Sequence, residues 1–271
     1  MFRINNKSEY EQIYEIKTHP TAAIIEYIIN PSKKVQLAAV EQYPESIKFI
    51  KDPCEEAQLL AVESKPYFIR YIKNPTEKTK LAAVNLDGLS IKYISEPSLE
   101  VQLEAVKEFS DSIKYIHNPS LKTQLAAIQE DSECFKYILN PYEEAQILAV
   151  KKDSSNIQYI PNPSEKVQMT AIKKNSTSLQ YIHNPSKKVQ LEAIRRNSGN
   201  LRCMKDFSLS MQLELVKQNI FLPIFDIESI LDTIDNIPEL FFEFLINNNY
   251  PFTEEFKNSK KYKQALLEYN I

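Results

Sequence analysis

The sequence predicts an all-α protein, a right-handed α-solenoid of about nine 22-residue units, each a helix followed by a short 3₁₀ helix, with helical caps at both ends. Three observations support this prediction. The chain repeats with a period of 22 residues, its apolar residues follow helical spacing within each unit, and it holds only two glycines in 271 residues. Because tight hairpins and phosphate-binding loops need glycine, this composition favours helices over sheets.

The period is marked by a residue that precedes a helix-opening proline and recurs without insertion or deletion. The segment "IKYIHNPSLKTQLAAI" (113–128) stands 22 residues after "IKYISEPSLEVQLEAV" and 22 residues before "FKYILNPYEEAQILAV". The marked residues are Asn30, Asp52, Asn74, Glu96, Asn118, Asn140, Asn162, Asn184 and a degenerate Asp206. Such self-similarity is typical of solenoids, in which each unit packs only on its neighbours.

Each unit suggests its own local structure. We expect the Asn or Asp before proline to be the helix N-cap, with proline as the first helical residue. Glutamates at four of the helix starts would then stand at N3 and complete a capping box: Glu55, Glu77, Glu143 and Glu165. A helix of about ten residues follows, and the "IKYI" segment forms a short turn, of 3₁₀ type, that leads to the next cap.

Two columns of identical residues run through the units. Alanine recurs where neighbouring helices must approach closely: Ala39, Ala61, Ala83, Ala105, Ala127, Ala149, Ala171 and Ala193. Glutamine recurs within the apolar arc, interrupted by Lys80: Gln36, Gln58, Gln102, Gln124, Gln146, Gln168, Gln190 and Gln212. A buried amide without a partner costs about 1–3 kcal/mol. We therefore favour a ladder in which each Gln bonds to turn carbonyls, over a polar groove for a ligand.

The chain is expected to divide into an N-terminal cap at 1–29, the repeat solenoid at 30–219 and a C-terminal helical cap at 220–271. The last block loses the period and is expected to form about three helices: "DIESILDTID", "IPELFFEFLINN" and "TEEFKNSKKYKQALLEY". Terminal caps cover the open ends of a solenoid. We expect Phe241, Phe242 and Phe244 to pack on Leu215, and a partner-docking surface is the alternative for these phenylalanines.

The phrase "NPSEKVQMTAIKKN" followed by "LQYIHNP" resembles the leucine-rich-repeat-variant and HEAT-like α-solenoids, over about residues 25–219. In the former, Asp or Asn with proline opens a helix and a shorter helix returns the chain. This chain departs from that pattern in its 22-residue unit and in Gln36 and its equivalents, which stand where that family tends to carry arginine. Similar repeats in uncharacterised proteins of low-GC bacteria and their phages imply, by analogy, partner binding or host interference, for example as an inhibitor.

Sequence motifs give no indication of catalysis. The three cysteines include no CxxC pair, and His117 and His183 lie three units apart, too far to share a metal ion. The chain contains no phosphate-binding, zinc-protease or nucleophile-elbow motif. We therefore expect no enzyme, no cofactor, no metal and no small-molecule substrate. The start has no apolar targeting segment and no stretch is apolar enough to span a membrane, so a cytoplasmic protein without a membrane partner is expected.

The first candidate surface is a basic column beside an aromatic column. The basic residues are Lys48, Arg70, Lys92, Lys114, Lys136 and Arg202, and the aromatic residues are Tyr27, Phe49, Tyr71, Tyr93, Tyr115, Tyr137, Tyr159 and Tyr181. Interleaved cations and rings can hold a nucleic-acid strand by phosphate contacts and stacking. We favour the simpler interpretation, in which each ring packs between layers with its hydroxyl at the rim. Within 113–128, Lys114 and Tyr115 are the candidate binding residues.

The second candidate surface is a basic ridge of three doublets at the ends of successive helices. The doublets are Lys151–Lys152, Lys173–Lys174 and Arg195–Arg196. Residues 145–219 carry 12 Lys/Arg and 5 Asp/Glu, a net charge of +7, whereas the segments on either side carry −5 each. This ridge is the best candidate for an electrostatic binding surface, and we predict a non-catalytic scaffold or adaptor that binds another protein on an extended face. The alternative is a HEAT-like protein that binds RNA or DNA through the ridge, and a second alternative is an enzyme whose site is not recognised.

Overall fold

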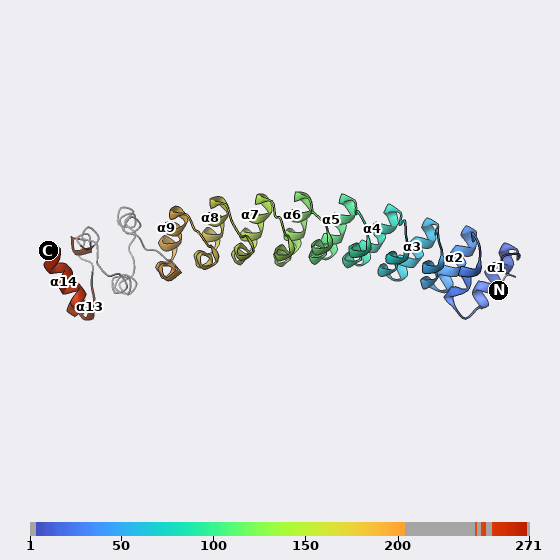
Figure 1. Ribbon diagram of the computed structural model, residues 1–271, viewed down its shortest axis with the longest axis horizontal. Coiled ribbons are helices and arrows are strands. Elements are labelled where there is room, and N and C mark those ends of the chain that lie inside the picture. The colour runs from blue at the N-terminus through green and yellow to red at the C-terminus, as the bar shows by residue number, and fades with distance from the viewer. Residues whose placement is uncertain (1–3, 204–241, 243–244, 248–250, 270–271) are drawn as a thin grey trace. The chain divides into compact units, whose positions relative to one another are not determined.

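The computed structural model describes residues 4–203, 242, 245–247 and 251–269. It confirms the predicted all-α solenoid, because within 4–203 an α-helix followed by a 3₁₀ helix occurs nine times in succession (Figure 1). The chain divides into two compact units, Met1–Leu148 and Ala149–Ile271. None of the helices in the described residues is both long enough and apolar enough to cross a membrane.

The helices have nearly constant lengths in both units. In the first unit they are α1 (Glu9–Thr18), η1 (Ala22–Tyr27), α2 (Lys33–Gln42), η2 (Pro44–Phe49), α3 (Glu55–Ser64), η3 (Pro66–Tyr71), α4 (Glu77–Leu86), η4 (Gly88–Tyr93), α5 (Leu99–Glu108), η5 (Ser110–Tyr115), α6 (Leu121–Glu130) and η6 (Ser132–Tyr137). The division falls within α7 (Glu143–Lys152). The second unit continues with η7 (Ser154–Tyr159), α8 (Glu165–Lys174), η8 (Ser176–Tyr181), α9 (Lys187–Arg196), η9 (Ser198–Cys203), α13 (Glu254–Asn258) and α14 (Lys260–Tyr269).

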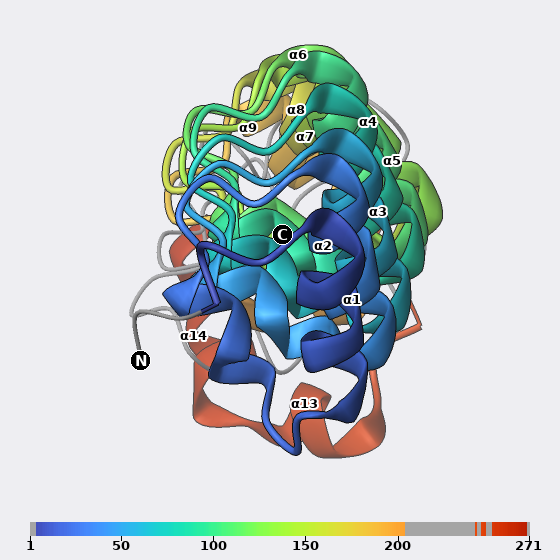
Figure 2. The same cartoon turned by 90° about the vertical axis from the view of Figure 1, so that its right-hand side faces the viewer.

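Like elements pack on like elements in successive repeats. In the first unit each α-helix from α1 to α5 contacts the next α-helix, and each 3₁₀ helix from η1 to η5 contacts the next 3₁₀ helix (Figure 2). The predicted alanine column lies at the helix contacts, with exposures of 0–1% from Ala39 to Ala193. A second apolar column fills the space behind the 3₁₀ helices and is equally buried: Ile25, Ile47, Ile69, Ile91, Ile113, Phe135, Ile157 and Leu179. Small residues on one side and large ones on the other set the spacing of the stack.

The predicted N-cap position was wrong by two residues. The helix begins after the residue that follows proline, and this residue is the true N-cap: Ser120 Oγ, for example, accepts a hydrogen bond from Thr123 N at 3.2 Å. Asn118 instead adopts a left-handed backbone, with φ of 49°, which Asn tolerates better than most residues. The Asn-Pro pair therefore forms the turn before the helix, and Ser or Thr caps it.

The predicted capping boxes were wrong for the same reason. Glu55, Glu77, Glu143 and Glu165 are the first residues of their helices and do not occupy N3. In that first turn their carboxylates still favour the positive end of the helix dipole. A capping box does occur at α1, where Ser8 N donates to Glu11 Oε2 at 2.8 Å and Glu11 N donates to Ser8 Oγ at 3.4 Å.

The helix ends explain why the chain needs so little glycine. Each α-helix from α2 to α6 ends in an extended residue, such as Asp131 with φ of −144° and ψ of 120°, and the N–H of this residue bonds to the helix, here to Ala127 O at 3.0 Å. The same residue is the N-cap of the 3₁₀ helix. Many helices instead end in a left-handed residue that is usually glycine. An extended cap is open to any residue, so the repeat dispenses with glycine.

The two ends of the chain differ from the repeat in detail. Residues 9–27 form an α-helix and a 3₁₀ helix like the later pairs, but two residues separate the helix from the 3₁₀ N-cap Thr21, which accounts for the lost sequence register. The expected helix over 253–269 is two helices, because Ser259 ends α13 in an extended conformation and accepts a hydrogen bond from Tyr262 N at 3.2 Å. The other two expected C-terminal helices lie largely outside the described residues. The three predicted domains stay a prediction.

Phe242, from the expected docking or capping segment, is fully buried. Its ring lies 6.2 Å from Phe252 and 5.4 Å from Tyr262. Phe241, Phe244 and Leu215 lie outside the described residues. The described part of this block therefore shows an aromatic core of its own, formed with α13 and α14.

Candidate functional site

The glutamine column is a hydrogen-bond ladder between repeats, as favoured from the sequence. Gln124 Nε2 donates to Pro119 O at 3.1 Å in its own repeat and to Asn140 O at 3.3 Å in the next, while Gln124 Oε1 accepts from Tyr142 N at 3.1 Å. The same pattern ties Gln36 to Cys54 N and, in the second unit, Gln168 to Ser186 N. Since these amides are satisfied by the backbone, the column is structural and is not a ligand groove.

The basic and aromatic columns meet in a continuous surface of the first unit, which we call the cation–aromatic face. Its residues are Lys48, Phe49, Arg70, Tyr71, Lys92, Tyr93, Lys114, Tyr115, Lys136 and Tyr137, all on η2 to η6. In each pair the cation lies over the neighbouring ring, with distances to the ring centroid of 4.7, 4.5, 4.8, 5.3 and 5.1 Å in chain order. The sequence-predicted residues Lys92, Lys114, Tyr115 and Lys136 are thus brought together.

Some cations also connect successive repeats across this face. Lys114 Nζ lies 5.3 Å from the ring centroid of Tyr115 and 5.3 Å from that of Tyr137 in the next repeat. Arg70 donates a hydrogen bond to the Tyr71 hydroxyl. Hydrogen bonding from Lys92 and then from Arg70 lowers the pKa of Tyr93. The face is therefore an ordered row of positive charge on an aromatic base.

The exposure of the rings bears on the two interpretations of the aromatic residues. Phe49, Tyr93 and Tyr137 are half-buried, whereas Tyr27, Tyr71, Tyr115, Tyr159 and Tyr181 are exposed. On η2 to η6 a ring that already carries a cation over it offers less free surface for a stacked base. Packing between layers therefore describes the three half-buried rings, and the role of the five exposed rings stays a prediction.

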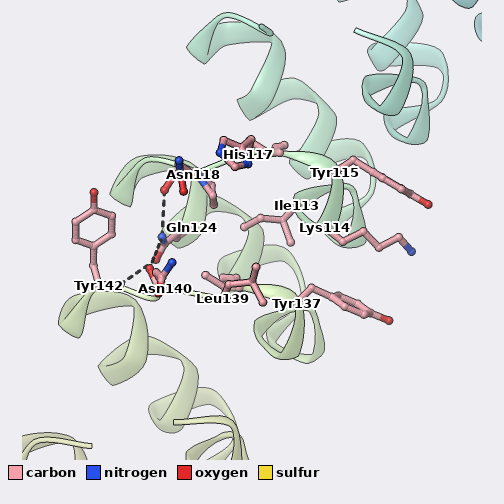
Figure 3. A pocket seen from close by; sticks show the side chains of 13 residues that line it. Ile113, Lys114, Tyr115, His117, Asn118, Gln124, Tyr137, Leu139, Asn140 and Tyr142 are labelled. Atoms are coloured by element: carbon pink, nitrogen blue, oxygen red, sulfur yellow. Dashed lines mark hydrogen bonds between the residues drawn. The ribbon is translucent and has the colours of Figure 1, made fainter. Parts of the chain in front are cut away.

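A pocket of about 540 Å³ lies next to the face, between the linkers that follow η5 and η6. Lys114, Tyr115 and Tyr137 point to one side of it, and Tyr142 lies on the opposite side (Figure 3). Gln124 lies between them with its ladder bonds (Figure 3). The pocket therefore reaches from the cation–aromatic face across the linkers to the start of α7.

Two lining residues of this pocket were missed from the sequence. Leu139 is 92% exposed, and Tyr142 is 52% exposed at the position that Ser or Thr fills before six of the other helices from α2 to α9. Comparison of the repeats position by position would have found both. At the Leu139 position the other repeats within 4–203 carry Ile29, Lys51, Lys73, Ser95, His117, Pro161 and His183. Neither side chain is required by the packing of the repeat.

The basic ridge lies in the second unit, at the ends of α7, α8 and α9. All six side chains are exposed, but Glu192 lies among them. Arg195 donates two hydrogen bonds to Glu192, each of 2.9 Å, and Arg196 Nε donates to the same carboxylate at 2.6 Å. Hydrogen bonding from Arg195 lowers the pKa of Glu192, so the carboxylate is ionised at neutral pH. One acid thus offsets part of the charge of the arginine doublet, while Lys173 and Lys174 extend the ridge.

Arg202 lies in η9 of the second unit, and the equivalent positions of the two preceding repeats hold Gln158 and Gln180. His19 Nδ1 lies 3.3 Å from Thr21 Oγ1 in an exposed turn. In the part of the chain that the structure describes, no three His, Cys, Asp or Glu residues come together in a way that would hold a metal ion.

Comparison with known proteins gives no relative of this chain. No protein-family model, curated protein sequence or solved structure matches it.

Proposed function

We propose that this protein is a non-catalytic cytoplasmic adaptor that binds another protein on the cation–aromatic face of its first unit, where it can act as a scaffold or an inhibitor. The observation that supports the proposal is the row of five stacked cations on η2 to η6. Arg70 and the four tyrosines of the face belong to types enriched at the energetic centres of protein interfaces, whereas its four lysines, a type depleted there, contribute charge complementarity. Here they are held in order before any partner arrives, which lowers the entropic cost of binding.

The charge of the surroundings favours a protein over a nucleic acid. Residues 1–144 carry a net charge of −5, so the positive row is a local feature of an acidic unit. Binding to nucleic acid gains most of its affinity from many phosphate contacts, which a net negative body opposes at long range. A local row of cations on an acidic unit suits a partner that carries carboxylates at matching positions.

Reversal of the charges tests the proposal directly. The variant Lys92→Glu/Lys114→Glu/Lys136→Glu keeps the exposed positions and removes the attraction, and it should lose the partners that the tagged wild-type chain captures from a lysate of its native cells, as read by mass spectrometry. The control is Lys151→Glu/Lys173→Glu/Lys174→Glu on the basic ridge, which makes the same change of charge. Equal capture by both variants and the wild type would contradict the proposal.

A gel shift tests the alternative of nucleic-acid binding. A single-stranded RNA or DNA that shifts with the wild-type chain, with a log–log salt slope of several units, would favour the ridge as the binding surface. That shift should disappear in Arg195→Glu/Arg196→Glu if the ridge carries it. We expect no shift at 50 mM salt, about the low end of the range in which phosphate contacts are strong.

A further inference from the structure

The pocket beside Lys114 has an equivalent four repeats earlier, which allows the two to be compared. The earlier pocket, about 460 Å³, is lined by Glu26, Ile29, Gln36, Lys51 and Asp52 among others. The later pocket has Lys114 at the Glu26 position, Leu139 at the Lys51 position and Asn140 at the Asp52 position. The two pockets have equivalent backbones but different linings. The earlier pocket carries both acidic and basic side chains, and the later pocket carries cationic and apolar side chains.

Charge gives the later pocket a clear preference. Its lining, which lies wholly in the described residues, contains Lys114 and His117 but no carboxylate. The nearest acid to Lys114 Nζ is Asp111, at 3.9 Å, a marginal ion pair on the neighbouring turn. A ligand that places a carboxylate here meets attraction without a facing acid.

Tyr142 is the strongest sign that the later pocket is used. At the same position Ser32, Ser120 and four other Ser or Thr residues accept a hydrogen bond from the backbone N–H of the third helical residue. The phenol ring of Tyr142 cannot form this hydrogen bond, so α7 lacks a side-chain cap and carries an exposed ring at this position (Figure 3). Local rules that a sequence breaks without structural gain are expected at functional positions.

Leu139 adds a second apolar group without a structural reason. It is 92% exposed on the linker between η6 and α7, at a position that charged, polar and apolar residues occupy in other repeats, including Ile29 at 74% exposure. Together with Tyr137 and Tyr142, whose rings lie on opposite sides of it, Leu139 lines the pocket (Figure 3).

We propose that this pocket seats an apolar side chain of an extended acidic segment of the partner protein, whose carboxylates lie along Lys92, Lys114 and Lys136. This inference rests on the proposed function, and it identifies the apolar side chain in the pocket as the anchor of the partner segment. Packed helices stand about 8–10 Å apart, and a segment in the extended polyproline II conformation, which has three residues per turn, advances about 3.1 Å per residue and presents every third side chain on the same face. Every third residue of the segment therefore meets the next cation, so Glu or Asp is expected at a spacing of three, with one Leu, Ile, Phe or Met at the pocket.

A displayed library of random 12-residue peptides, selected against the full chain, identifies the preferred chemistry without prior choice of a partner. The expected motif combines acids at every third position with one large apolar residue. The best peptide, labelled with a fluorophore, is then measured by anisotropy beside a copy in which Ser replaces the apolar residue. The Ser peptide should bind at least about tenfold more weakly, as expected for the loss of a buried aliphatic group.

Matched variants locate the anchor. Leu139→Ser and Tyr142→Ser should each weaken the apolar peptide by about fivefold or more and should leave the Ser peptide unchanged. The controls make the same changes in the equivalent sites of the earlier repeats, Ile29→Ser and Cys54→Ser, and should bind like the wild type. Thermal melts of all four variants verify that the fold is intact.

The outcomes separate the inference from the proposed function. Peptides that are acidic but show no apolar preference, or an apolar preference that Leu139→Ser and Tyr142→Ser leave intact, would overturn the inference while the cation–aromatic face remains a protein-binding surface. No enriched peptide at all, or enriched peptides that bind equally to Lys92→Glu/Lys114→Glu/Lys136→Glu, would overturn the proposed function as well. A short single-stranded RNA that displaces the selected peptide and binds more tightly would assign the face to nucleic acid.

Discussion

The side-chain oxygen of Gln58 accepts a hydrogen bond of 3.0 Å from the backbone N–H of Thr76, the residue that caps the helix of the next repeat. The amide of Gln58 also donates to Pro53 O at 2.9 Å and to Asn74 O at 3.5 Å. One side chain thus satisfies backbone groups on both sides of the junction between two repeats. These hydrogen bonds hold the turn before the next helix in place and favour one arrangement of the two neighbouring repeats.

Loss of such a side chain should be costly. Gln58→Leu leaves Thr76 N and Pro53 O without this partner, so we expect the free energy of unfolding to fall by about 1–3 kcal/mol, measured by urea denaturation. The exposed Gln42→Leu in α2 is the control and should change it by no more than about 0.5 kcal/mol. Equal effects of the two changes would argue against the ladder.

The ladder has a gap at Lys80 that a single change should fill. Lys80 Nζ lies 3.6 Å from Glu77, whose carboxylate also accepts a hydrogen bond from the Ser98 hydroxyl. Lys80→Gln places an amide where it can bond to Pro75 O and Ser98 N, and it removes a partly exposed ion pair whose 3.6 Å separation makes it weak. We expect the free energy of unfolding to rise by about 0.5–1.5 kcal/mol and the melting temperature to rise with it. A lower melting temperature would show that Lys80 is needed where it stands.

The two glycines should respond differently to alanine. A Cβ at Gly88 would lie 2.5 Å from Ala105 O and 2.8 Å from Glu108 Oε2, whereas one at Gly199 would meet, among the described residues, the Asn197 side chain at 3.2 Å and 3.9 Å. Neither glycine has a positive φ, so space alone distinguishes them. Gly88→Ala should destabilise the protein by about 1–3 kcal/mol, while Gly199→Ala should be near neutral. Thermal melts of the two variants verify this, and a neutral Gly88→Ala would mean that α5 moves freely.

The cysteines should differ in their reaction with iodoacetamide. Burial, reinforced by Asp131 and Asp111, raises the pKa of the Cys134 thiol to about 12. Since the thiolate is the reactive form, Cys134 should remain unmodified at pH 8, while the exposed Cys203 is alkylated. Peptide mass spectrometry after a short reaction measures both. Fast labelling of Cys134 in the folded chain would reveal opening of η6. In urea, where the chain is unfolded, Cys134 and Cys203 should be alkylated to the same extent.

The cap positions without a hydroxyl should be improvable. Tyr142→Ser and Cys54→Ser each restore a capping oxygen, so each should raise the free energy of unfolding by about 0.5–2 kcal/mol. For Tyr142 a gain in stability would accompany the loss of peptide binding, which excludes misfolding as the cause. A loss of stability in Tyr142→Ser would mean that the ring packs as part of the fold.

The repeat, the alanine column and the glutamine ladder could be predicted because a strict 22-residue period places equivalent side chains in equivalent surroundings. The helix start could not, since Asn118 before proline and Ser120 after it both suit an N-cap. The structure places the cap at the later residue in repeats with a left-handed residue before proline, such as Asn118, and in repeats without one. The site was only partly predictable. Sequence brings Lys114 next to Tyr115, but the position of the cation between Tyr115 and Tyr137 depends on side-chain torsions and on the spacing of the stack.

The ladder bonds also have a mechanical consequence for the first unit. Each joins a glutamine to the repeat that follows it, so the bonds resist separation of neighbouring repeats. A pulling force applied at the ends of this unit would load the junctions in series, and the weakest one would open first. The junction between α4 and α5 lacks the ladder bond because Lys80 replaces glutamine, and it is held by other bonds, from Ser98 to Glu77 and from Gly88 N to Glu108; we expect it to open first. The stack is therefore expected to lengthen stepwise under tension, with this junction separating at a lower force than the others.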